Sequence, residues 1–394
     1  MKRIIILPGG INKICRLSLL FLLAVTIISC KGREGILDAE NYSSVDSAVV
    51  SAKGFTIEKK ENYSVVTIKN PWQGAEGISM VHYLVKRGTP VPGEIDSGKV
   101  IFVPVESIVC MSTTHVGMIA ALGKGNSIKG LSGVNLVYDP EISTMTDKGL
   151  VSEVGYETSM NQELIIKLSP DIVMMYGIGS ESAGHVNKIR ELGIKIMFNG
   201  DYLETEPLAK AEWIKLFGSL FCEEELADSI FQAEMLEYNR IKNIVINSKN
   251  SAPSVLLGLP YKETWYVSPG NSFVSRLIED AGGNYIWKNT VSATSMPYGL
   301  ENVYIAAMNA DYWLNIGSVS GSNEIRMVDK RLTDLKCFKN GNLYNNNKRV
   351  NPSGGNDYWE SGAVKPHIIL LDMASILHPE LFPDHILYYY QKIK

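Results

Sequence analysis

The stretch VESIVCMSTTHVGMIAALG, residues 105–123, decides the fold. Residues 108–111 form a short apolar run, which is typical of a strand that is covered on both faces. Small polar residues follow at 112–115, and the apolar residues up to Gly123 favour a helix that ends there. In an open α/β sheet, the loop after such a strand faces the ligand crevice. The stretch therefore predicts that residues 113–115 edge a crevice, although an ordinary strand-to-helix turn has the same pattern.

Length and composition allow two globular lobes. The chain has 394 residues, of which 45% are hydrophobic and 20% charged, and its net charge is −4. These values exclude a disordered chain and give no sign of a nucleic-acid surface. The cysteines form no closely spaced pair and the histidines no HxxH or HExxH pair, so we expect neither a metal centre nor a cofactor. Cys110, Cys222 and Cys337 are expected to be free thiols, with a disulfide between two of them as the alternative.

The amino-terminal 30 residues read as a targeting segment. Basic residues precede an apolar run at 17–28 that is too short for a comfortable membrane span. The sequence Ile27-Ile28-Ser29-Cys30 resembles the lipobox of bacterial lipoproteins. This resemblance implies that Cys30 becomes the lipidated amino terminus and anchors a periplasm-facing protein to a bacterial membrane. A plain membrane anchor and a signal peptide cleaved elsewhere are the alternatives. The polar stretch 31–52 is expected to be a flexible tether.

Short apolar strands alternate with helical stretches in two places, with a helical region that is almost free of glycine between them. The segments SPDIVMMYG at 169–177 and NADYWLNIG at 309–317 repeat an Asp, an apolar run and a closing Gly at the same offsets. This weak repeat predicts two lobes of similar architecture. Residues 139–148 are expected to be a polar excursion and 260–268 a polar loop. The predicted domains are a signal peptide at 1–30, the tether at 31–52, α/β lobes at 53–206 and 251–394, and a connecting helical region at 207–250.

Several motifs in this order resemble those of the substrate-binding proteins of ABC importers for iron complexes and cobalamin. They are Leu122-Gly123, Val154-Gly155, Leu168-Ser169-Pro170-Asp171, the segment LIEDAGGN at 277–284 and His378-Pro379. The resemblance covers about residues 100–383. It implies two Rossmann-like α/β lobes that are joined by a long rigid helix and hold a ligand in the cleft between them. It also implies a monomer that performs no catalysis and that works with the permease and ATPase of an ABC importer.

Aromatic and basic side chains after strand ends are the candidate ligand contacts, because aromatic rings supply broad contact area at low entropic cost. The candidates are Thr114, His115, Tyr156, Tyr176 and Tyr202 in the first lobe, and Tyr261, Trp265, Tyr266, Tyr298, Arg349 and Trp359 in the second. Each aromatic residue could instead pack within its own lobe, but Trp265 is assigned to the cleft because its neighbours are polar. Arg349 and Lys348 could meet a carboxylate or phosphate. His115 could ligate the metal of haem or a corrinoid, or instead cap its helix or bond a carbonyl.

The resemblance also implies that one carboxylate in each lobe docks on arginines of the permease. Glu279 matches the second-lobe position, with a solvated helix-end charge as the alternative. In the first lobe, the expected glutamate is replaced by Gly117, which leaves docking through that lobe open.

We expect the ligand to be an iron complex, either a ferric siderophore or haem, because these dominate the family. Cobalamin is the alternative within the family. A periplasmic enzyme and a structural lipoprotein are the alternatives from other classes. The chain has no GxSxG motif, no Walker loop and no GxGxxG after a strand, so nothing in it supports a catalytic set.

Overall fold

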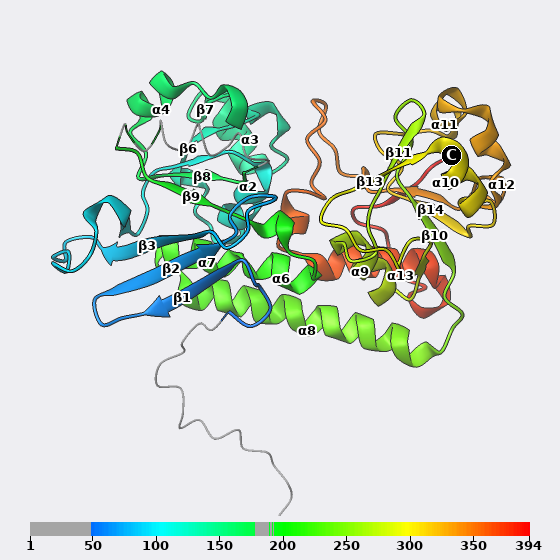
Figure 1. Ribbon diagram of the computed structural model, residues 1–394, viewed down its shortest axis with the longest axis horizontal. Helices are drawn as coiled ribbons and strands as arrows, with labels where there is room; N and C mark the ends of the chain where they lie inside the picture. Colours follow the sequence, from blue (N-terminus) through cyan, green and yellow to red (C-terminus); the bar gives the residue numbers. More distant parts are fainter. Residues whose placement is uncertain (1–48, 178–188, 190, 192) are drawn as a thin grey trace, which may run out of the picture. The chain divides into compact units, whose positions relative to one another are not determined.

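A computed structural model describes residues 49–177, 189, 191 and 193–394 (Figure 1). The predicted signal peptide, its Cys30 and nearly all of the predicted tether lie outside these residues. Within the described part of the chain, no helix is both long enough and apolar enough to cross a membrane.

The first lobe is built on a parallel sheet in the order β7-β6-β5-β8-β9. Its strands are β5 Ile108–Cys110, β6 Ile128–Leu131, β7 Ser152–Glu153, β8 Ile172–Met175 and β9 Ile196–Phe198. The helices between them are α2 Thr113–Ala121, α3 Pro140–Asp147 and α4 Gln162–Leu168. Every residue of β5, β8 and β9 is buried, as expected for strands that are covered on both faces. The strand, loop and helix predicted at 105–123 are confirmed as β5 and α2.

A second, mostly antiparallel sheet precedes this lobe. It consists of β1 Phe55–Lys59, β2 Tyr63–Lys69, β3 Ser79–Lys86 and β4 Val100–Val103, in that order. The hairpin of β1 and β2 follows the alternation of apolar and polar residues in the sequence. β4 pairs with β3 in parallel, which a chain of simple hairpins would not produce.

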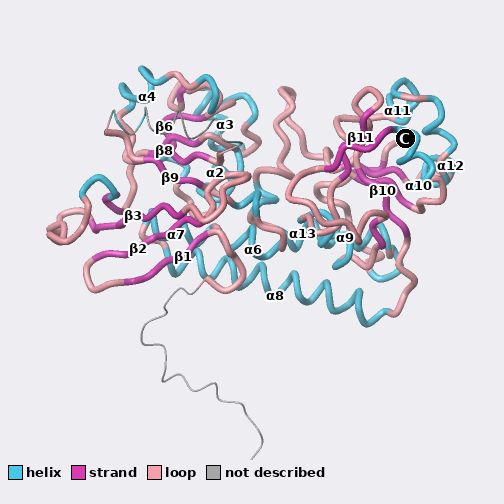
Figure 2. Tube along the Cα trace, in the orientation of Figure 1, coloured by secondary structure: helices cyan, strands magenta, loops and turns pink. Residues whose placement is uncertain are grey.

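The second lobe repeats the parallel plan with the order β12-β10-β14-β15-β16. Its strands are β10 Ser254–Leu257, β12 Asn284–Tyr285, β14 Tyr312–Leu314, β15 Leu343–Asn345 and the antiparallel β16 Gln391–Lys392. A separate hairpin pairs β11 Thr264–Val267 with β13 Met296–Gly299. The helices are α9 Phe273–Asp280, α10 Leu300–Ala307, α11 Ser322–Val328, α12 Lys336–Lys339 and α13 Pro366–Leu377. Figure 2 shows strands and helices alternating in both lobes.

The internal repeat in the sequence corresponds to the same local geometry in both lobes. In the first lobe, the N–H of Ser107 donates to the Asp171 carboxylate at 3.0 Å, and the N–H of Asp171 donates to the Ser107 carbonyl at 3.0 Å. In the second lobe, the N–H of Ser254 donates to the Asp311 carboxylate at 2.8 Å, and the N–H of Asp311 returns to the Ser254 carbonyl at 3.0 Å. Each aspartate thus fixes the start of one central strand against its neighbour, β8 against β5 and β14 against β10.

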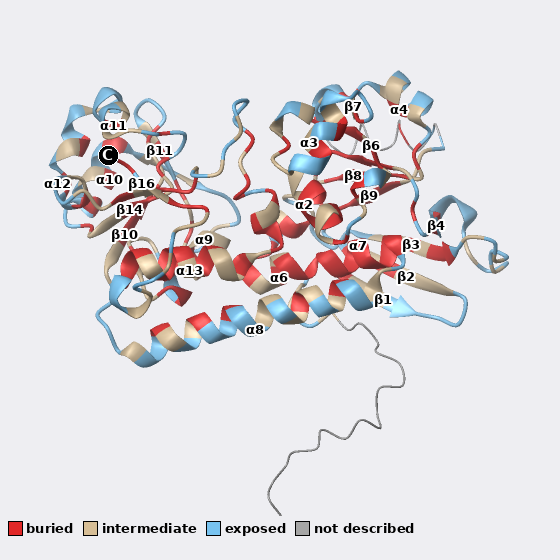
Figure 3. Cartoon of the chain, turned by 180° about the vertical axis from the view of Figure 1, so that it is seen from behind, coloured by how far each residue is buried: buried red, intermediate tan, exposed pale blue. Residues whose placement is uncertain are grey.

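The helical region between the lobes forms α6 Pro207–Glu212, α7 Ile214–Phe221 and α8 Glu224–Ser248. The helical conformation is interrupted between α7 and α8 at Cys222, which adopts the left-handed conformation with φ 55°. α7 is buried along its whole length, whereas α8 alternates buried and exposed residues (Figure 3). The long connecting helix is therefore confirmed as α8, which has 25 residues.

Two separate hydrophobic cores show how α8 joins the lobes. Ala227 and Phe231 of α8 belong to the core of the first lobe, whereas Tyr238, Ile241 and Val245 belong to that of the second. The transition lies inside one continuous helix, so α8 is part of both lobes. The predicted residue bounds of the individual domains stay predictions.

Two local predictions are wrong. The polar excursion at 139–148 is helix α3, whose start is capped by the Asp139 carboxylate accepting from the N–H groups of Glu141 and Ile142, both at 3.0 Å. Asp139-Pro140 is a helix-start signal that the polar composition hid. The polar loop around Trp265 contains strand β11, which pairs with β13.

Candidate ligand-binding site

A cavity of the second lobe opens where its parallel strands end. It has a volume of about 670 Å³ and lies at the carboxyl ends of β10, β14 and β15. Ligands bind at this end of the strands in open α/β sheets. The lining residues are Leu257, Gly258, Tyr266, Ser268, Phe273, Val274, Asn315, Gly317, Ser318, Ser320, Asn346, Asn347, Val350, Gly354, Asn356, Tyr358 and Trp359. We call this cavity the strand-end pocket.

The strand-end pocket combines amide groups with aromatic rings, and none of its described lining side chains carries a charge. Trp359 is 50% exposed and stands edge-on against Tyr358, with ring centroids 4.7 Å apart. Tyr266 is 59% exposed. Asn346, Asn347 and Asn356 form what we call the amide wall of the pocket. Asn356 donates from Nδ2 to the Asn346 carbonyl at 3.1 Å, which fixes the orientation of its side chain. The pocket suits a ligand that has a flat apolar surface and neutral hydrogen-bonding groups.

Of the residues predicted from the sequence, Tyr266 and Trp359 lie together in this pocket. Tyr261 is 68% exposed on the β11 side and lies beside the ammonium of Lys262, 5.4 Å from the ring centroid. Tyr298 stacks on Trp287 in the adjoining hairpin, with centroids 6.3 Å apart. Neither Tyr261 nor Tyr298 is among the lining residues.

The placement of Trp265 in a cleft is wrong. Its side chain is fully buried, packs on Trp313 with centroids 5.8 Å apart, and donates its indole N–H to the Leu257 carbonyl at 2.9 Å. Successive residues of a strand point to opposite faces, so Tyr266 is exposed because Trp265 is buried. The polar residues before Trp265 therefore do not indicate which face of β11 its side chain occupies.

His115 is also a core residue rather than a ligand contact. It is fully buried, its ring centroid lies 6.1 Å from that of Phe217, and neither ring nitrogen has a hydrogen-bond partner in the described part of the chain. Burial lowers the pKa of His115 to about 3, so the imidazole is neutral. The cap of α2 is instead Ser112, whose Oγ accepts the Thr114 N–H at 3.3 Å. Thr114 is half-buried beside it.

The first-lobe tyrosines lie after the ends of its own strands. The rings of Tyr176 and Tyr202 meet edge to face, 6.2 Å apart. The hydroxyl of Tyr202 donates to the Gly177 carbonyl and accepts the Gln73 N–H at 3.0 Å. Burial raises the pKa of Tyr202 to about 12, so the phenol stays protonated. Tyr156 is 63% exposed. None of these three tyrosines is among the residues that line the strand-end pocket.

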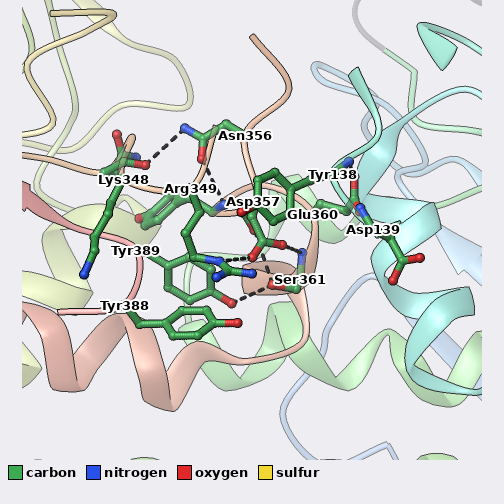
Figure 4. Close-up of polar contacts among 12 residues, drawn as sticks. Tyr138, Asp139, Lys348, Arg349, Asn356, Asp357, Glu360, Ser361, Tyr388 and Tyr389 are labelled. Carbon is green, nitrogen blue, oxygen red and sulfur yellow. Dashed lines mark hydrogen bonds and ion pairs between the residues drawn. The ribbon is translucent and has the colours of Figure 1, made fainter. Parts of the chain in front are cut away.

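Arg349 lies in a second, smaller cavity of about 240 Å³. Its Nε donates to the Asp357 carboxylate at 2.6 Å, and its guanidinium carbon lies 4.9 Å from the ring centroid of Tyr138 and 4.2 Å from that of Tyr388 (Figure 4). Lys348 donates to the Leu387 carbonyl. Neither Arg349 nor Lys348 is among the residues that line the strand-end pocket.

The carboxylate of Glu279 is exposed near the end of α9 and forms an ion pair with Arg276. In the first lobe, Gly117 is buried in α2 against the backbone of Glu360. A Cβ atom at position 117 would overlap the Glu360 carbonyl oxygen and lie 2.7 Å from its carbon. A glutamate could not be accommodated there without displacing one of the two segments.

The amide wall is the part of the site that was missed from the sequence. Its signal was the run Asn345-Asn346-Asn347, which begins at the last residue of β15 and continues past it, with Asn356 following. Among the described residues, no group of three or more His, Cys, Asp or Glu side chains could hold a metal ion.

Comparison with known proteins agrees with this architecture. An uncharacterized lipoprotein of Methanocaldococcus jannaschii is 25% identical over 412 residues, covering 97% of this chain and 96% of the relative. A second uncharacterized lipoprotein of that organism is 28% identical over 335 residues, covering 81% of this chain and 82% of the relative.

Two solved structures share the fold. One is a possible iron-binding (periplasmic solute-binding) protein of Staphylococcus epidermidis, with TM-score 0.55, 17% identity and coverage of 70% of this chain and 99% of that one. The other is a periplasmic heme binding protein of Pseudomonas aeruginosa, with TM-score 0.54, 15% identity and coverage of 70% and 93%. Residues 108–348, more than half of the sequence, match the family of periplasmic binding proteins. The chain, with its two α/β lobes joined by α8, belongs to the periplasmic binding protein family.

Proposed function

We propose that this chain is the lipid-anchored substrate-binding component of an ABC importer, which captures an iron complex, either a ferric siderophore or haem, and delivers it to the permease. The strand-end pocket carries the proposal, because it places exposed aromatic rings at the carboxyl ends of parallel strands. Two proteins with the same fold are a possible iron-binding protein and a periplasmic heme binding protein, which supports this ligand class.

Cobalamin is a second candidate, and the uncharged lining of the strand-end pocket favours it. The corrin ring carries neutral amide side chains, which asparagine amides can pair with as donors and acceptors. An anionic siderophore or the propionates of haem would gain most from cationic partners. Arg349 lies in a separate cavity and its Nε is paired with Asp357, so its charge is already partly compensated.

In this proposal the protein performs no chemistry on its ligand. Lipidation at Cys30 would hold it at the membrane, beside the permease and ATPase of the importer. Glu279 would dock on a permease arginine, and its present ion pair with Arg276 would exchange for that contact. We further propose that the protein works as a monomer.

The experiment is a calorimetric titration of the purified chain with haemin, cyanocobalamin and a panel of ferric siderophores. Saturable one-to-one binding of one ligand at sub-micromolar concentration would support the proposal and identify the class. Binding of cyanocobalamin alone would favour the second candidate. If none of these compounds binds, both candidates are refuted while the fold assignment stands.

A further inference from the structure

A segment of the second lobe is held by the first lobe. We define the crossing segment as residues 346–364, between β15 and α13. The Glu360 carboxylate is 2% exposed and accepts the N–H groups of Tyr138 at 2.9 Å and Asp139 at 2.7 Å (Figure 4). Tyr138 and Asp139 belong to the first lobe, directly before α3. Both carboxylate oxygens of Glu360 are therefore used to hold the other lobe.

Asn351 makes a second contact of the same kind. Its Nδ2 donates to the carbonyl groups of Asn135 and Val137, both at 2.9 Å. Its Oδ1 accepts the N–H of Gly355 at 2.8 Å, within the crossing segment itself. One asparagine side chain thus ties the turn of the crossing segment to residues 135–137 of the first lobe.

The backbones of the two lobes pack against each other at Gly355, where there is no room for a side chain. A Cβ atom on Gly355 would overlap the Leu136 carbonyl oxygen and lie 2.5 Å from its carbon. Ala363 and Val364, at the end of the crossing segment, belong to the hydrophobic core of the first lobe. The segment is therefore part of the packing of both lobes.

The same segment forms one wall of the strand-end pocket. The residues that it contributes are Asn346, Asn347, Val350, Gly354, Asn356, Tyr358 and Trp359. Asn351 and Glu360, which hold the first lobe, lie among these residues along the chain. Asp357 pairs with Arg349 at 2.6 Å, and the Arg349 guanidinium lies 4.9 Å from the ring centroid of Tyr138 in the first lobe.

We propose that the crossing segment couples the first lobe to the strand-end pocket. Glu360 and Asn351 are positioning residues: they clamp residues 135–139 of the first lobe and thereby hold the wall of the pocket in place. The clamp itself does not depend on the proposed function. Only its consequence for ligand binding rests on the strand-end pocket being the ligand site.

The surroundings of Glu360 make the clamp sensitive to pH. Burial raises the pKa of Glu360 from an ordinary value of 4.5 to about 7. The hydrogen bonds from Tyr138 and Asp139 act to lower this pKa, whereas the negative charges of Asp357 and Asp139 raise it further. Glu360 lines the smaller cavity of about 240 Å³ that also contains Arg349. The remaining titratable groups that line it are Lys365 and Tyr388, and α2 contributes only Gly117, Ala120 and Ala121 to its lining.

Proton linkage determines how the clamp responds to pH. The clamped state, with its raised pKa, binds the proton of Glu360 more tightly than an opened state in which the carboxyl is solvated. Protonation therefore favours the clamp, and the clamp weakens as pH rises from 4.5 toward 7. Between pH 8 and pH 6 the equilibrium constant for clamping should increase about tenfold.

Hydrogen exchange measured by mass spectrometry on the purified full chain, without ligand, tests the clamp. In Glu360→Ala, the peptide that contains Tyr138 and Asp139 should exchange at least tenfold faster, and so should the peptide that covers residues 346–359. Asn351→Ala should produce the same pattern to a smaller extent. Glu141→Gln, an exposed change in the adjoining helix turn, is the matched control and should leave both peptides unchanged.

The peptide with Tyr138 and Asp139 reports on the clamp, and the peptide at residues 346–359 reports on the coupling to the pocket wall. Faster exchange at Tyr138 and Asp139 with no change at residues 346–359 would refute the coupling, and no change at either would refute the clamp. Glu360→Gln, which keeps the side-chain shape but does not titrate, should remove the tenfold difference between pH 8 and pH 6 after correction for intrinsic exchange. A difference that persists in Glu360→Gln would refute the role of this carboxyl. Because no ligand is present, failure of the ligand titration would leave these results unaffected.

Discussion

Replacing Gly117 with alanine should destabilise the protein, although the same change inside a helix normally stabilises it. The helix propensity of alanine favours the substitution by up to about 1 kcal/mol. The new Cβ atom, however, would lie 2.7 Å from the Glu360 carbonyl carbon and closer still to its oxygen. An ordinary contact between such atoms needs about 3.5 Å, so α2 and the crossing segment would have to separate by roughly 1 Å.

Overpacking of this kind costs about 1–3 kcal/mol, which exceeds the gain in helix propensity. We therefore expect Gly117→Ala to lower the free energy of unfolding by about 1 kcal/mol net. The assay is urea unfolding followed by circular dichroism. The matched control is Gly93→Ala in an exposed loop, where no described atom lies within 4 Å of the added Cβ. That change should stabilise by about 0.4–1 kcal/mol through the unfolded chain. A Gly117→Ala protein as stable as the Gly93→Ala protein would refute the close approach of the lobes.

Two further predictions concern buried groups. Trp265→Ala should lower the free energy of unfolding by about 3–5 kcal/mol, whereas Trp359→Ala should change it little, because Trp359 is half-exposed. Differential scanning calorimetry distinguishes the two variants. Equal melting temperatures would contradict the core position of Trp265. Although burial acts to raise it, hydrogen bonds from Lys336 and Ser254 hold the pKa of Asp311 below its usual value of 3.8. The stability that Asp311 contributes is therefore present above about pH 4 and lost as pH falls through its folded-state pKa. Asp311→Asn should be less stable than wild type at pH 7, and the difference in unfolding free energy should shrink at acid pH; a constant difference would contradict this role.

The repeated parts of the fold could be predicted because their causes are local. Asp171 and Asp311 each precede a short apolar run. The structure shows that each ties its strand to the neighbouring strand by the same two contacts, one through its carboxylate and one through its N–H. The glycine-poor region before the second lobe predicted the long connecting helix, which is α8.

The site could be predicted less well, because burial on a short strand depends on tertiary packing. Trp265 and Tyr266 are neighbours in β11 with similar composition around them, yet one is fully buried and the other is largely exposed. His115 follows polar residues, but the first turn of α2 points it at Phe217. The contacts of Glu360 with Tyr138 and Asp139 join residues more than 200 positions apart, and no local pattern announces them.

The most direct test of the central claim, that the strand-end pocket is the ligand site, is the affinity of Trp359→Ala for the ligand found in the titration. Tyr261→Ala, which removes a similarly exposed aromatic ring outside the pocket lining, is the control. Loss of one aromatic stacking surface removes about 1 kcal/mol or more of binding free energy, and the buried area lost with the indole adds to this. The account predicts at least tenfold weaker binding for Trp359→Ala and unchanged binding for Tyr261→Ala. Unchanged affinity in Trp359→Ala, with the protein still folded, would contradict it.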